Sequence, residues 1–209
     1  WKLNKTKSKA IHTAQHFVVA AKDYILLPEE NGTLNILNRK GEQRIKVKGK
    51  IDFSNNKLFV VKGVTLAETR IVTIDNKGVQ QNILFDGTID NSIQFEFDDE
   101  MYYSYELAHH IGVESEDLKV NGEEMNFQYS FDNQKLSTPK LTEFKNQLYI
   151  SITDLTAEEA YLFRSPNELV DGFPLYGKTT GIIRDIDLDE KLNFIIGGES
   201  GMLYNYSAE

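Results

Sequence analysis

The chain of 209 residues has a formal net charge of −9 at pH 7, with 40% hydrophobic and 26% charged residues. This composition is typical of a globular protein with at least one well-buried domain, and it excludes an intrinsically disordered chain. The negative charge disfavours binding to the phosphate backbone of nucleic acids, and the absence of cysteine excludes disulfides and thiolate metal sites.

No apolar run reaches the roughly 20 residues that a membrane-spanning helix needs, so no membrane insertion is expected. The chain begins with Trp1 and has no signal-peptide pattern at that end. We therefore expect a processed product or a fragment of a longer protein.

The first predicted elements form a meander of three strands, at 24–27, 33–38 and 42–48. Asn31-Gly32 separates the first two strands and is a strong signal for a tight hairpin. Lys40-Gly41 marks the second turn, and the strand after it alternates between apolar and polar residues. Three consecutive antiparallel strands are therefore expected.

The rest of the chain has the same features: short alternating or apolar runs separated by turns that contain glycine, asparagine or aspartate. Strands are predicted at 57–61, 70–75, 79–85, 92–98, 101–107, 118–120, 125–131, 147–153, 160–163, 181–187, 192–197 and 202–206. The glycine-rich stretch 197–201 connects two of these strands and is interpreted as a hairpin turn.

Similar stretches recur about every forty residues. The pattern of apolar strand, acidic turn, glycine and apolar strand at 24–34 returns at 194–203. Four strands in about forty residues is the size of one propeller blade. Five such units are predicted, and they begin near residues 11, 51, 92, 138 and 180.

The sequence therefore predicts one all-β domain over 1–209, a single β-propeller of about five four-stranded blades. The last unit has three clear strands, so residues 1–5 are expected to supply its fourth strand and to close the ring. The alternatives are a solenoid-like run of hairpins, a piece of a larger propeller, and a two-sheet sandwich, which does not explain the period.

Residues 182–196, which read IIRDIDLDEKLNFII, resemble an FG-GAP-type propeller repeat, in which alternating aspartates precede an apolar strand. In its repeat rhythm the whole chain resembles the propeller segments of large envelope proteins from Bacteroidetes bacteria. The resemblance implies a propeller fold and an extracytoplasmic setting, in the periplasm or at the cell surface. It implies no enzyme activity.

The best chemical candidate is a calcium site formed by Asp185, Asp187, Asp189 and Asn193. These residues occupy positions one, three, five and nine of a loop, where alternating oxygens can converge on a hard cation. Glu190 stands where a glycine normally makes the sharp turn, and Asn193 is a neutral ligand. The alternative interpretation is a solvated acidic strand end with an ordinary turn.

Other polar and aromatic groups are expected to have structural or surface roles. His12 and His16 have i, i+4 spacing but no His-Glu-x-x-His pattern, and the adjacent His109 and His110 would point to opposite faces of a strand, so no metal site is expected there. The acids near strand ends form no evident pair for glycoside hydrolysis. The alternation of Phe95 and Phe97 favours core packing, and one of the consecutive Tyr102 and Tyr103 is expected to be exposed. These groups are His12, His16, His109 and His110; Asp98, Asp99, Glu100, Glu106 and Asp154; and Phe95, Phe97, Met101, Tyr102, Tyr103 and Tyr105.

The chain contains no phosphate loop and no nucleophile elbow, so neither catalytic nor cofactor-binding residues are predicted, apart from the possible calcium ligands. We expect a non-enzymatic binding or scaffolding module that recognises a protein or a glycan on its loop face. The alternatives are a glycan-processing enzyme with carboxylates in the central channel and a purely structural domain of a larger envelope protein.

Overall fold

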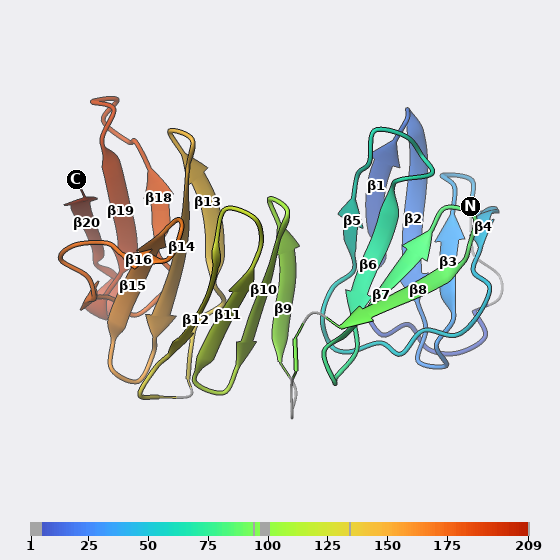
Figure 1. Ribbon diagram of the computed structural model, residues 1–209, viewed down its shortest axis with the longest axis horizontal. Helices are drawn as coiled ribbons and strands as arrows, with labels where there is room; N and C mark the ends of the chain where they lie inside the picture. The colour runs from blue at the N-terminus through green and yellow to red at the C-terminus, as the bar shows by residue number, and fades with distance from the viewer. Residues whose placement is uncertain (1–5, 94, 97–100, 134, 209) are drawn as a thin grey trace. The chain divides into compact units, whose positions relative to one another are not determined.

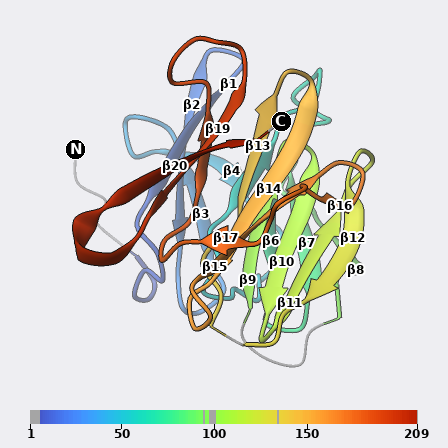
Figure 2. The same ribbon diagram turned by 90° about the vertical axis from the view of Figure 1, so that its left-hand side faces the viewer.

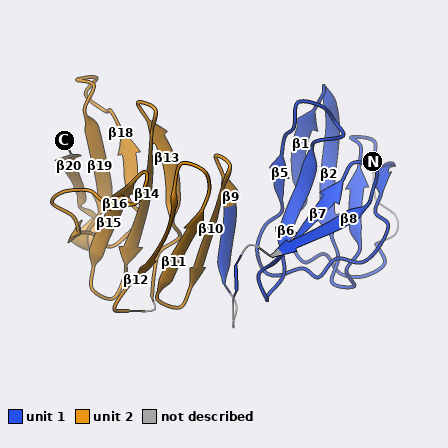
Figure 3. Ribbon diagram, in the orientation of Figure 1, with its two compact units in different colours: residues 1–104 blue, residues 105–209 orange. Residues whose placement is uncertain are grey.

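The computed structural model describes residues 6–93, 95–96, 101–133 and 135–208. These residues form five antiparallel sheets of three to five strands, so the all-β prediction is confirmed (Figure 1). Within the described residues, no helix has the length and the apolar character needed to span a membrane. The chain divides into two compact units, residues 1–104 and 105–209 (Figure 3).

The first unit contains two four-stranded sheets with sequential strand order. Their strands are β1 (Gln15–Val19), β2 (Lys22–Pro28), β3 (Leu34–Leu37) and β4 (Gln43–Lys46), followed by β5 (Phe59–Val61), β6 (Arg70–Ile74), β7 (Val79–Leu84) and β8 (Ile89–Ile93). Buried residues of both sheets pack together in one core cluster, which includes Tyr24, Leu26, Ile36, Ile71 and Ile83.

The second unit contains three sheets. The first consists of β9 (Tyr102–Glu106), which spans the unit boundary, β10 (His109–Glu114), β11 (Asp117–Asn121) and β12 (Asn126–Ser130). The second consists of β13 (Lys140–Phe144), β14 (Gln147–Asp154), β15 (Glu159–Arg164), β16 (Glu168–Leu169) and β17 (Leu175–Tyr176). The third consists of β18 (Ile182–Arg184), β19 (Leu192–Gly197) and β20 (Leu203–Ala208), with a 3-10 turn at Glu199–Gly201.

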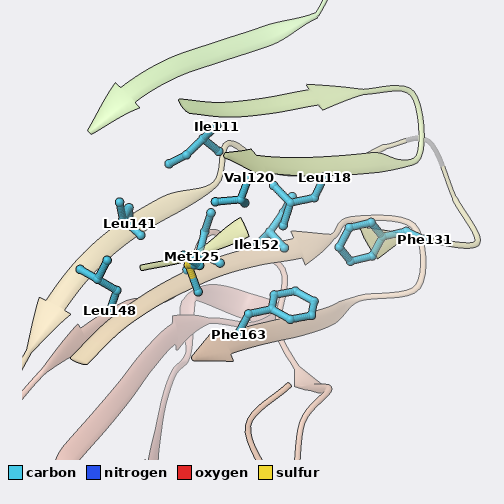
Figure 4. Packing of buried hydrophobic residues seen from close by; sticks show 10 residues of the cluster. Ile111, Leu118, Val120, Met125, Phe131, Leu141, Leu148, Ile152 and Phe163 are labelled. Atoms are coloured by element: carbon cyan, nitrogen blue, oxygen red, sulfur yellow. The ribbon is translucent and has the colours of Figure 1, made fainter. Parts of the chain in front are cut away.

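The middle sheet of the second unit has a core cluster on each face. Side chains alternate between the faces of a strand, so Leu148, Ile150 and Ile152 of β14 enter a cluster shared with β10 and β11 (Figure 4). Tyr149 lies on the other face, against the cluster that this sheet shares with β18 and β19. Figure 2 shows β13, β14 and β15 side by side.

The predicted propeller is wrong. The five sheets are separate, and none of them is closed or curled into a propeller. Each of the five predicted starting points does precede the first strand of one sheet. Hairpin signals act between neighbouring residues, so the sequence could locate these units along the chain. Ring closure depends on how whole sheets pack, which a local pattern does not encode. Residues 1–5, the predicted closing strand, lie outside the described residues.

Several predicted turns are confirmed by their hydrogen bonds. The Asn38 side chain accepts the backbone N–H groups of Lys40 and Glu42, and Gly41 has a φ of 79°. Asp75 accepts the N–H groups of Lys77 and Val79 in the same way, ahead of β7. Stretch 197–201 joins the paired strands β19 and β20, as the sequence indicated.

Candidate functional site

The predicted calcium residues lie in the loop between β18 and β19. Carboxylate oxygens of Asp185, Asp187 and Asp189, one from each, lie within 4.8 Å of one another. Two oxygens bound to one Ca²⁺ can be separated by up to about 5 Å, twice the usual Ca–O distance. The three aspartates are therefore close enough to share an ion.

Hydrogen bonds shape this loop. Asp185 Oδ2 accepts the Glu190 N–H at 3.1 Å, whereas Asp185 Oδ1 is buried with no hydrogen-bond partner among the described residues. Asp189 Oδ1 accepts the Lys191 N–H at 2.8 Å. Glu190 has a φ of 67°, so the chain makes its sharp turn without the glycine that the motif normally contains.

Asn193, the fourth predicted ligand, makes a hydrogen bond within the loop. Its side chain is only 4% exposed, and its Oδ1 accepts the Ile186 N–H at 2.9 Å across the base of the loop. Asn193 thus helps to hold the loop closed, and the three aspartates are the carboxylates of the predicted ligand set. A calcium ion needs six or more oxygens, so water or backbone carbonyls would supply the remainder.

A pocket of about 450 Å³ lies beside this loop, within the second unit. We call it the β14 pocket. It is lined by residues from four segments of the chain, 144–149, 164, 170 and 190–192: Phe144, Lys145, Gln147, Tyr149, Arg164, Val170, Glu190, Lys191 and Leu192. Glu190 belongs to both features, and its carboxylate lies 3.3 Å from the Lys145 ammonium.

Strand register places the polar and aromatic lining residues on one face of the middle sheet. Phe144 of β13 pairs with Gln147 of β14, and Tyr149 of β14 pairs with Arg164 of β15. Directly opposed residues in antiparallel strands project to the same side, so these four side chains share a face. That face is opposite the one from which Leu148 and Ile152 enter the core (Figure 4).

The floor of the β14 pocket is apolar and its rim is charged. Val170 and Leu192 are buried in the adjoining core cluster, and Phe144 and Tyr149 pack against that cluster. Lys145, Glu190 and Lys191 are exposed at the rim. Arg164 donates to Glu168 at 2.6 Å, and this hydrogen bond raises the pKa of the guanidinium above its ordinary value.

A larger cavity of about 610 Å³ lies in the first unit, among the turns that precede β3 and β7. Two of its polar lining residues, Asn31 and Asp75, build those turns. Asn31 Oδ1 accepts the Thr33 N–H, and both donors bound by the Asp75 carboxylate belong to its own turn. The lining of this cavity is mostly polar, whereas Phe144, Tyr149, Val170 and Leu192 give the β14 pocket a mainly apolar lining.

The remaining sequence candidates do not converge on one site. His12 contacts the Ser54 carbonyl, His16 contacts Asp23, and His109 is buried with Nδ1 at 2.6 Å from the Leu107 carbonyl. Of the acids near strand ends, Asp154 is 2% exposed and hydrogen bonded, and 98–100 lie outside the described residues.

Among the described residues of the aromatic run, Phe95, Met101 and Tyr103 are buried, and Tyr102 and Tyr105 are partly exposed. Phe95 and Tyr103 are buried and pack edge to face with ring centroids 6.4 Å apart. Phe97 lies outside the described residues. Sequence reasoning missed the β14 pocket because its residues come from four segments. The strand pairing alone could have signalled that Phe144 and Tyr149 share a face.

The sequence matches no protein-family model and no curated protein sequence. The resemblance of residues 182–196 to FG-GAP repeats therefore stays a prediction. Among solved structures, the chain is similar to the crystal structure of the computationally designed Ika8 protein, with a TM-score of 0.55 and 12% identity. The similarity covers 93% of this chain and 57% of the designed one, and it shows the fold alone.

Proposed function

We propose that the chain is a non-enzymatic binding module and that the β14 pocket holds part of its protein or glycan partner. The observation that carries the proposal is the combination of an apolar floor, including Phe144 and Tyr149, with a charged rim. Ligand sites combine a largely apolar lining with a few polar groups that fix orientation, and volumes of roughly 300–1,000 Å³ are usual.

The chemistry of the lining supports binding over catalysis. Glycoside hydrolysis needs two carboxylates across the scissile bond, and Glu190 is the one carboxylate among the described lining residues. The buried Asp154 accepts hydrogen bonds from Asn133 and from two backbone N–H groups, so its oxygens are already used in the fold.

The test compares wild-type protein with Tyr149→Ala on arrays of oligosaccharides and peptides. Tyr149 presents an aromatic ring to the pocket, so its removal should weaken binding of a pocket ligand roughly tenfold. Tyr129→Ala is the matched control, because Tyr129 is a half-buried tyrosine of the same unit that packs against the other core cluster. Circular dichroism checks that both variants fold.

The proposal is supported if wild type and Tyr129→Ala bind the same array ligand and Tyr149→Ala does not. If no saccharide or peptide is retained, or if both variants bind as wild type does, the pocket is not a binding site. If no ligand is retained at all, a purely structural role is favoured.

A second candidate function is calcium binding by Asp185, Asp187 and Asp189. The convergence of the three carboxylates and the buried Asp185 Oδ1 without a partner favour it. Three carboxylates and an incomplete shell suggest a weak site, with a dissociation constant of roughly 10⁻⁴–10⁻³ M.

Isothermal titration with CaCl₂ tests this candidate. We expect a saturable heat in wild type that Asp187→Asn abolishes, because Asp187 is exposed and its loss leaves two carboxylates. Asp171→Asn, at an exposed acid of the same unit outside this group, should leave binding unchanged. The site is excluded if Asp187→Asn and Asp171→Asn give the same heat of calcium binding, or if wild type gives no heat.

A further inference from the structure

The β14 pocket concentrates positive charge in an acidic protein. Three of its lining residues are cationic and one is anionic, whereas the whole chain has a formal charge of −9. Within the described residues, Lys145 is paired with Glu190, Arg164 is paired with Glu168, and the Lys191 ammonium makes no ion pair. Asp171 also acts electrostatically on Arg164, so Lys191 is the rim cation without an ion pair in the described part of the chain, and an anionic group would meet Lys191 first.

The ion pair between Lys145 and Glu190 at the rim does not prevent an anionic ligand from binding there. The side chains of Lys145 and Glu190 are 54% and 83% exposed. Pairs as exposed as this contribute little stability, so a ligand carboxylate can take the place of Glu190 beside Lys145 at small cost. Arg164 uses one N–H group for Glu168, and its other N–H groups have no partner among the described residues.

The pocket also contains groups that can hydrogen bond to the hydroxyl groups of a ligand. Gln147 donates from its amide nitrogen to the Ser165 carbonyl at 2.8 Å and to the Ser165 hydroxyl. These bonds hold the amide in place and leave its Oε1 as an acceptor. Among the described residues, the Tyr149 hydroxyl has no hydrogen-bond partner. An oriented acceptor and an amphoteric hydroxyl thus lie on the same face of β14.

The two aromatic rings supply an apolar surface beside these polar groups. Phe144 and Tyr149 are half-buried against the core cluster, which fixes their positions and leaves part of each ring accessible. A pyranose ring has an apolar face of C–H groups and an equatorial belt of hydroxyls. Such a ring can pack on an aromatic side chain while its hydroxyls reach neighbouring polar groups.

We infer that the β14 pocket binds an acidic oligosaccharide, with a uronic acid carboxylate at the Lys145, Arg164 and Lys191 rim and a sugar ring on Phe144 and Tyr149. This inference rests on the proposed binding function and names its ligand class. A saccharide is favoured over an acidic peptide because the cavity of about 450 Å³ has the size of a small-ligand site.

The experiment titrates trigalacturonate, its methyl ester and hexaglutamate against the protein, by isothermal calorimetry. The methyl ester keeps the sugar rings and removes the charges, and hexaglutamate keeps the charges on a peptide. We expect trigalacturonate to bind at least about tenfold more tightly than either probe. Its affinity should fall when NaCl rises from roughly 0.05 to 0.5 M, because salt screens exposed charges.

The variant Lys145→Glu/Lys191→Glu should weaken trigalacturonate binding by roughly tenfold or more, since two attractions become repulsions. A matched control is Lys40→Glu/Lys77→Glu, which makes the same change in net charge at two exposed turn lysines of the first unit. It should bind trigalacturonate as wild type does. Tyr149→Leu keeps an apolar side chain and should also weaken binding.

Failure of the inference and failure of the proposed function give different results. If the methyl ester or hexaglutamate binds as tightly as trigalacturonate, and Tyr149→Ala abolishes that binding, the pocket is a ligand site but the acidic-saccharide inference is wrong. The same holds if the arrays show pocket-dependent binding of a neutral sugar or a peptide only. If no probe and no array ligand depends on the pocket, both proposals are overturned.

Discussion

Buried Asp154 illustrates how single polar residues maintain this fold. It ends β14 and is 2% exposed, and its oxygens accept hydrogen bonds from Thr156 N–H, Ala157 N–H and the Asn133 amide, each at 2.9 Å. Burial by itself raises the pKa of this carboxyl, but the three hydrogen bonds together lower it below the ordinary value. The charged form is thus favoured in the folded state.

This lowered pKa leads to a pH-dependent prediction for Asp154→Asn. A carboxyl whose pKa is lower when folded stabilises the fold above its unfolded pKa of about 3.9, and loses that contribution as the pH falls through the folded pKa. We expect the variant to be about 1–3 kcal/mol less stable than wild type at pH 7. The difference should shrink at pH 3. Urea unfolding at the two pH values measures it.

The exposed variant Asp171→Asn provides the control, and it should change stability little at either pH. A difference between Asp154→Asn and wild type that is the same at pH 7 and pH 3 would contradict a role for the ionised carboxylate.

At the scale of elements, some hairpins have turn residues that the sequence makes recognisable, and others do not. Turns with Gly41 or Gly78 were predictable, because glycine adopts positive φ without strain. The β9–β10 hairpin turns at Leu107 and Ala108, and both have positive φ. Such residues give no turn signal, so the strand His109–Glu114 was not predicted. The strand Lys140–Phe144, which carries Phe144 of the pocket, was also not predicted, although Asn146 in the turn after it is a residue that favours turns.

The β1–β2 hairpin allows the energetic cost of positive φ at a residue other than glycine to be measured. Ala20 and Ala21 are exposed, with φ of 46° and 57°. Left-handed backbone costs an L-residue roughly 1–2 kcal/mol, and glycine escapes that cost at some expense in entropy. We expect Ala21→Gly to stabilise the chain by about 0.5–1 kcal/mol. Ala21→Val should destabilise it, because a β-branched residue tolerates this conformation poorly.

Thermal or urea unfolding of the two variants provides the comparison. Equal stability of Ala21→Gly and Ala21→Val would show that this turn stores no backbone strain.

At the scale of the whole molecule, each unit has its own buried clusters. Ile71 belongs to the cluster of the first unit and Ile150 to a cluster of the second, and both are fully buried. Truncating a buried isoleucine to alanine typically costs 2–5 kcal/mol, through lost burial and the cavity left behind. We expect Ile71→Ala and Ile150→Ala each to destabilise the protein by about that amount.

Differential scanning calorimetry of these two variants also tests the prediction of one domain over 1–209. If the chain melts in one transition and both substitutions lower its midpoint, the two units unfold together as a single domain. Two transitions, each lowered by one substitution only, would overturn that prediction. An unchanged midpoint in either variant would contradict the assigned core position.

By itself, the sequence determined the all-β class, most strand positions, the glycine-containing turns and the approximate starting points of the five sheets. These depend on alternation and turn chemistry, which act over a few residues. It also predicted that Asp185, Asp187 and Asp189 lie together, because they belong to one short loop. Only the tertiary structure decided that the sheets stay separate and that Asn193 bonds to its own loop. Only it assembled the β14 pocket, because side chains from four segments meet through strand register and sheet packing.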